Sequence, residues 1–97
     1  MTINYEMKVQ ELIPKCVDEI PQELESGKLY LCAKYKIAIH LCACGCGIKT
    51  VTPLGEGEWT LTGENELYTL RPSIGNFMGE NPYHAHYYVT KNKIEWL

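Results

Sequence analysis

Residues 37–52 have the sequence Ile-Ala-Ile-His-Leu-Cys-Ala-Cys-Gly-Cys-Gly-Ile-Lys-Thr-Val-Thr, which decides the fold class that we predict. Apolar side chains alternate along residues 37–41, so every second one lies on the same face of a strand. Gly45 and Gly47 permit a tight turn whose backbone can approach a bound ion closely. The strand then resumes at residues 48–52. This stretch therefore predicts a β-hairpin whose turn carries a group of cysteines.

The rest of the chain extends this pattern into a mainly β fold. Pro21 and Gly27 fit the first and last positions of one helical turn, and we expect no other helix. The pair Lys91-Asn92 predicts the turn of a C-terminal hairpin. We expect one small antiparallel β domain over residues 1–97, built from zinc-ribbon-like hairpins with little helix. The further predicted strands lie at 29–32, 59–62, 67–70, 86–90 and 93–97, and an irregular loop is expected at 71–76.

Composition narrows the class of protein. The 97 residues are 45% hydrophobic and 22% charged, which is typical of a small globular domain that a metal cross-link would help to stabilise. A net charge of −3 argues against a nucleic-acid partner. No apolar run approaches the roughly 20 residues of a membrane-spanning helix. Residues 1–6 do not resemble a secretory signal, so we expect a cytoplasmic location, where cysteines bind metal more often than they form disulfides.

Five side chains are candidate ligands for a structural zinc ion. Zinc prefers thiolate and imidazole ligands in a tetrahedral arrangement. We expect Cys44, Cys46 and His86 to bind the ion, with either His84 or Cys42 as the fourth ligand. The ion would then join the cysteine turn to a distant segment. The competing interpretation is that the cysteines are simply buried, and the sequence does not distinguish zinc from iron.

Signatures of catalysis are absent from the sequence. Neither H-E-x-x-H nor H-x-E with P-C-x-x-C occurs, so the motifs of common zinc enzymes are missing. Glu80, the acid nearest the two histidines, is expected to be solvated. Ser73 has no basic residue beside it, which favours an ordered turn over a nucleophile. Arg71 could bind an anion from the same loop.

Isolated large or polar side chains are assigned to the core. Trp59 and Trp96 follow alternating β patterns and are predicted to be packed inside. His40 is expected to be structural. Cys16 and Cys32 stand apart from the cysteine group and behave as small apolar residues.

A series of motifs runs along the chain: P-x-E-L-x-x-G-x-L-Y at 21–30, H-L-C-x-C-G-C-G at 40–47, a tryptophan strand at Trp59, P-S-I-G-N at 72–76, H-Y-[YFW]-[IV] at 86–89 and I/V-x-W at 94–96. Their order resembles that in a bacterial family of uncharacterised small proteins, often encoded beside ubiquitin-like modifiers, activating and conjugating-type enzymes and JAB-type peptidases. The resemblance covers about three quarters of the chain. Many members have a cysteine three residues before the histidine matched by His86; this chain has Tyr83 there, and His84 is the obvious substitute.

The sequence and this resemblance together predict a zinc-stabilised β domain without catalytic activity. Its expected role is that of an accessory or protein-interaction module, and the resemblance implies a place in a bacterial ubiquitin-like conjugation system. The alternative is a metal-dependent enzyme of unknown substrate, in which the fifth candidate ligand indicates an open coordination position. The sequence identifies neither the protein partner nor the oligomeric state.

Overall fold

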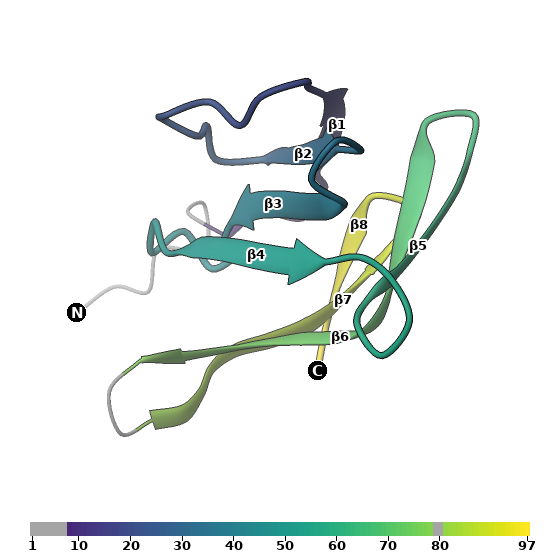
Figure 1. Ribbon diagram of the computed structural model, residues 1–97. Helices are drawn as coiled ribbons and strands as arrows, with labels where there is room; N and C mark the ends of the chain where they lie inside the picture. Colours follow the sequence, from purple (N-terminus) through teal and green to yellow (C-terminus); the bar gives the residue numbers. More distant parts are fainter. Residues whose placement is uncertain (1–7, 79–80) are drawn as a thin grey trace.

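The computed structural model describes residues 8–78 and 81–97, and for residues 77, 78 and 81–84 it describes the backbone alone. The chain forms two four-stranded β-sheets that pack against each other (Figure 1). The described ranges contain no helix, so none that could cross a membrane. The prediction of a mainly β domain is therefore confirmed.

The first sheet contains the predicted cysteine hairpin. Its order is β1-β2-β3-β4, with β1 and β2 parallel and the other neighbours antiparallel. The cysteines lie in the turn between β3 and β4, as the alternating pattern and the two glycines indicate. The strands are β1 (Ile13–Cys16), β2 (Lys28–Cys32), β3 (Ile37–Leu41) and β4 (Lys49–Pro53).

The second sheet is an antiparallel meander in the order β5-β6-β7-β8. The predicted turn at Lys91 and Asn92 joins its last two strands, and both residues have positive φ angles, 48° and 70°. β6 and β7 are each longer than any other strand of the protein. The hairpin that they form runs beneath β4 in Figure 1. The strands are β5 (Thr60–Glu64), β6 (Leu67–Met78), β7 (Asn81–Thr90) and β8 (Lys93–Trp96).

Two local predictions were wrong. Residues 21–27 form bends and a turn rather than a helical turn, although Gly27 does adopt a positive φ of 85°. Residues 71–76, expected to be a loop, belong to β6. The register shows why: between the pairs Leu70–Val89 and Ile74–Tyr87, three residues of β6 face one residue of β7. Such a bulge accommodates a proline inside a strand, because its position need not donate to the ladder.

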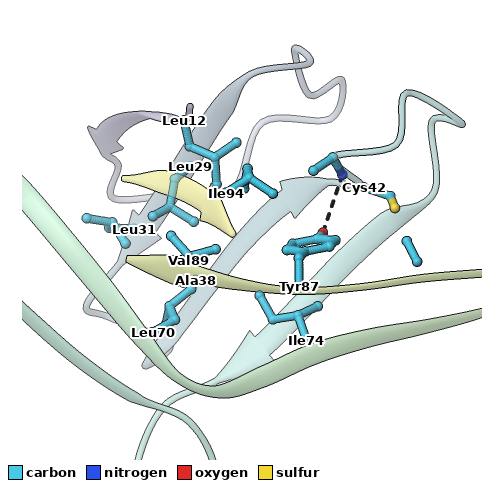
Figure 2. Close-up of a cluster of buried hydrophobic side chains, with 12 residues drawn as sticks. Leu12, Leu29, Leu31, Ala38, Cys42, Leu70, Ile74, Tyr87, Val89 and Ile94 are labelled. Carbon is cyan, nitrogen blue, oxygen red and sulfur yellow. Dashed lines mark hydrogen bonds between the residues drawn. The ribbon is translucent and has the colours of Figure 1, made fainter. Parts of the chain in front are cut away.

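The core lies between the two sheets and takes side chains from both (Figure 2). Tyr87 is its largest fully buried side chain. Trp59 and Trp96 pack against the core but are only half-buried, so the prediction that both lie inside it was too strong. The buried apolar cluster contains Leu12, Leu29, Leu31, Ala38, Cys42, Ala43, Leu70, Ile74, Ala85, Tyr87, Val89 and Ile94.

Candidate functional site: a cysteine cluster and a serine–histidine pair

The turn after β3 brings three cysteines together. The sulfur atoms of Cys42, Cys44 and Cys46 all lie within 4.8 Å of one another, and those of Cys42 and Cys44 are 3.5 Å apart. Gly45 and Gly47 have φ angles of 90° and 85°, which ordinary side chains rarely adopt, so glycine is what lets the chain wrap around the sulfurs. Cys42 is buried, Cys44 half-buried and Cys46 exposed. The cluster thus opens from the core towards solvent.

The protonation chemistry of this turn favours a cation. Burial and the adjacent sulfurs of Cys46 and Cys42 raise the pKa of Cys44 to about 12, because a thiolate there would be poorly solvated and close to its neighbours. Without a cation the Cys44 thiol is therefore protonated at neutral pH. A soft divalent metal would displace protons from the sulfurs and compensate their charge. The donor set fits zinc or another thiophilic metal.

The two predicted histidine ligands lie in β7. His86 is half-buried, and its Nε2 lies 2.8 Å from Oγ of Ser73. Within the described part of the chain, the close group of potential metal ligands consists of the three cysteines and does not include His86. The side chain of His84 lies outside the described residues. The structure thus brings three of the five candidate ligands together and places His86 against a serine.

The Ser73–His86 pair follows from strand alternation. Ile74 and Tyr87 are paired across β6 and β7 and are both buried in the core. Their neighbours Ser73 and His86 therefore lie on the opposite face of the sheet. Gly75 is paired directly with His86 and carries no side chain, so Ser73, two residues earlier, is the diagonal neighbour that meets the imidazole.

Sequence reasoning missed this pair because it looked for a base beside Ser73 in the chain. The base comes from 13 residues away, on the adjacent strand. A correct prediction of the β6–β7 hairpin would have found it, since P-S-I-G-N and H-Y-Y-V then lie on neighbouring strands. The hydroxyl donates to Nε2 when the imidazole carries its proton on Nδ1. This is the arrangement in which a histidine can accept a serine proton.

The segment before Ser73 is held by hydrogen bonds from Trp59, which precedes β5, and from Thr60, the first residue of β5. The indole N–H of Trp59 donates to the carbonyl oxygen of Pro72 over 3.1 Å, and the hydroxyl of Thr60 donates to that of Arg71 over 3.4 Å. Both carbonyl groups lie in the bulge, where the strand ladder is interrupted. These bonds fix the backbone immediately before the serine.

The Arg71 guanidinium holds the same bulge from the side of β7. Nη1 donates to the carbonyl oxygens of Leu70 and Val89 over 2.8 and 3.2 Å, and Nη2 donates to Oγ1 of Thr90 over 2.9 Å. The guanidinium carbon also lies 4.5 Å from the ring centroid of Tyr88. These contacts use most of the N–H donors of Arg71 within the sheet and give this side chain a structural role in the bulge.

A buried tyrosine connects the cysteine turn to the strand of His86. The Tyr87 hydroxyl lies 2.7 Å from Nε2 of His40. It also accepts a hydrogen bond of 3.3 Å from the Ala43 amide, drawn as the dashed line in Figure 2. Burial lowers the pKa of His40 to about 4, so this imidazole is neutral at pH 7 and, as expected, structural. Tyr87 is adjacent to His86 in the chain, and Ala43 lies between Cys42 and Cys44. The two candidate sites are thus joined through one side chain.

Fold and site together define a small all-β protein with a cysteine cluster and a hydrogen-bonded serine–histidine pair. Residues 16–97 match the model of the BubE family, described as the bacterial ubiquitination-like system serine protease, and the chain belongs to this family. The expected place in a bacterial ubiquitin-like system is thereby confirmed at the level of the family. No curated protein and no solved structure matches the chain significantly.

Proposed function

We propose that this protein is a serine protease of a bacterial ubiquitination-like system, with Ser73 as the nucleophile and His86 as its general base. The observation that carries the proposal is the 2.8 Å contact between Ser73 Oγ and His86 Nε2. This distance is within the range required for direct proton transfer between a nucleophile and its base. The description of the BubE family as a serine protease supports the same assignment.

The chemistry follows from the two side chains. Ser73 Oγ attacks the carbonyl carbon of a peptide bond while its proton moves to His86 Nε2. His86 then gives that proton to the departing amine as the carbon–nitrogen bond breaks, which leaves an ester between Ser73 and the substrate. A water molecule, deprotonated by His86, attacks the ester, and the serine recovers its proton. The products are a carboxylic acid and an amine.

A fluorophosphonate tests this proposal without knowledge of the substrate, because it phosphonylates only serines that a base activates. We expect mass spectrometry to find one adduct, on Ser73. Ser73→Ala and His86→Ala should abolish labelling, while Ser26→Ala, which changes the only other serine of the chain, should label like the parent. Folded parent protein that stays unlabelled at mildly alkaline pH would refute the assignment.

We also propose that the cysteine turn holds a structural zinc ion through Cys42, Cys44 and Cys46. The close approach of the three sulfurs and the chemistry of the donor set support it. His84 of β7 is our candidate for the fourth ligand, because His86 is engaged with Ser73. The ion would then link the turn to the strand that carries the general base.

Elemental analysis of protein purified without added metal tests the second proposal. We expect one equivalent of zinc, and we expect His84→Ala to weaken its binding sharply. His40→Gln is the control, since His40 bonds to Tyr87 and should not be a ligand. Folded protein without stoichiometric metal would overturn the zinc assignment and leave the serine protease assignment untouched.

A further inference from the structure

Among the residues that the structure describes, no strand pairs with one side of β6 next to Ser73. β5 pairs with residues 67–71 of β6 and its pairing ends at Thr60–Arg71, whereas β6 continues to Met78 (Figure 1). Within the parts of the chain that the structure describes, residues 72–78 therefore pair with β7 on one side only. Ser73 lies at the beginning of this open edge.

The hydrogen-bond pattern shows which backbone groups face the open edge. The amide of Leu97 donates to the carbonyl oxygen of His86 over 3.0 Å, so the His86 carbonyl points towards the β8 side of β7 and away from β6. The Gly75–His86 pair is then of the non-hydrogen-bonded kind. Gly75 consequently directs both its N–H and its C=O away from β7, towards the open edge. It does so two residues from Ser73.

The composition of this edge is unusual for a protein that must avoid aggregation. Proteins commonly protect edge strands with charged residues, prolines or short length. The other edge strands follow this rule, because β1, β4, β5 and β8 each contain Lys, Glu or both. The open edge begins with Pro72, but after it the segment 73–78, Ser-Ile-Gly-Asn-Phe-Met, contains no charged residue and no further proline. Its composition is that of a strand that pairs with another chain.

We propose that the open edge of β6 binds an extended segment of the polypeptide substrate by β-strand addition, with the backbone of Gly75 as its anchor and the scissile bond at Ser73. This inference rests on the proposed protease function. The absence of a side chain at Gly75 lets the substrate backbone approach both the edge and His86 closely. Recognition of this kind comes mainly from main-chain hydrogen bonds, so it selects an unfolded or extended tail rather than a particular side chain.

Backbone hydrogen exchange tests the inference directly. Full-length Ser73→Ala protein is mixed with a synthetic mixture of random octapeptides, and amide exchange is followed by NMR. At a peptide concentration of ten times Kd, exchange at Gly75 should slow about tenfold, while the β4 and β8 edges should be unaffected. The control is the same mixture with N-methylated backbones, which has the same side chains but cannot donate main-chain hydrogen bonds. It should give no protection.

Three results would overturn the inference: no protection at Gly75, equal protection by the N-methylated peptides, or sedimentation showing that this edge joins two copies of the chain instead. The fluorophosphonate experiment separates this failure from that of the protease assignment. A labelled Ser73 with an unprotected edge would refute only the substrate-binding mode. An unlabelled Ser73 would refute the protease itself, whatever the exchange data show.

A matched pair of substitutions at Gly75 refines the assignment. In the Ser73→Ala background, Gly75→Pro removes the N–H that faces the open edge but leaves the bonds from β6 to β7 intact. It should weaken peptide binding roughly 3- to 10-fold, the effect of one hydrogen bond. Gly75→Ala keeps that N–H and should bind more tightly than the proline variant. Equal affinities for the two variants would contradict the anchor role. If the proline variant does not fold, the N-methylated peptides test the anchor role instead, because they are added to Ser73→Ala protein that keeps Gly75.

Discussion

The cysteine turn and the Ser73–His86 pair differ in how the chain assembles them. The three cysteines lie within five consecutive residues, so one turn places their sulfurs together. Ser73 and His86 are 13 residues apart and meet only because β6 and β7 pair in a particular register. The first arrangement depends on local backbone conformation and the second on the sheet. Loss of either one should therefore leave a distinct signature.

Metal removal should produce the largest effect. If zinc joins the cysteine turn to β7, metal-binding energy is also folding energy, on the order of 10 kcal/mol for small zinc sites. We expect a strong chelator to unfold the domain, measured by circular dichroism, and acid to release the ion because protons compete for the thiolates. Uptake of the metal at neutral pH should release protons.

Two cysteine variants check that this effect belongs to the cluster. Cys46→Ser should behave like the chelated protein. Cys16→Ser changes a cysteine that is exposed and far from the turn in sequence, and it should retain both metal and fold. A chelated protein that keeps its spectrum and its melting temperature would show that the cysteine turn is not a folding element.

Ser73→Ala should separate the two regions most clearly. We expect proteolytic activity to fall roughly 10⁴-fold or more, because the covalent route is lost. The hydroxyl is only half-buried and makes one hydrogen bond to His86, so the free energy of unfolding should change by about 1 kcal/mol at most. Metal content should stay constant. A variant that retains more than a tenth of the parent activity would show that Ser73 is not the nucleophile.

The sequence predicted the hairpins well and the site only in part. Alternation, the glycines around Cys46 and the turn at Lys91-Asn92 specify β3, β4, β7 and β8, because each is a local pattern. The cysteine cluster was visible for the same reason. The Ser73–His86 pair was not visible, because nothing in a linear sequence states which residues of two strands lie opposite each other.

The bulge in β6 explains this failure in physical terms. Pro72 normally argues against a strand, so residues 71–76 were predicted to be a loop. The strand continues because Trp59 bonds to the carbonyl of Pro72 and Arg71 bonds to the carbonyl of Val89, and both contacts are tertiary. The same irregularity fixes where Ser73 lies relative to His86. The feature that hid the strand from sequence analysis is thus the one that builds the candidate site.

Tyr87→Phe should weaken the connection between the two regions. It removes the hydroxyl shared by His40 and the Ala43 amide and leaves both buried groups without that partner. An unpaired buried polar group costs about 1–3 kcal/mol, so we expect a loss of this size in urea denaturation. Tyr88→Phe keeps the ring beneath Arg71 and should change stability by less than about 0.5 kcal/mol. Equal losses in the two variants would show that the Tyr87 hydroxyl has no special role.

The smallest predicted effect concerns Trp59, whose indole N–H holds the carbonyl of the residue before Ser73. Trp59→Phe keeps most of the packing but removes this hydrogen bond, which costs about 0.5–1.5 kcal/mol of stability. Because the bond fixes the backbone next to Ser73, activity should fall by up to about tenfold in kcat, while metal content stays constant. Trp96→Phe is the matched control: the Trp96 N–H is buried without a partner among the described residues, so its removal costs no hydrogen bond. It should leave kcat within about threefold of the parent value. If both variants lower kcat alike, the effect comes from general loosening of the sheet rather than from the bond that positions Ser73.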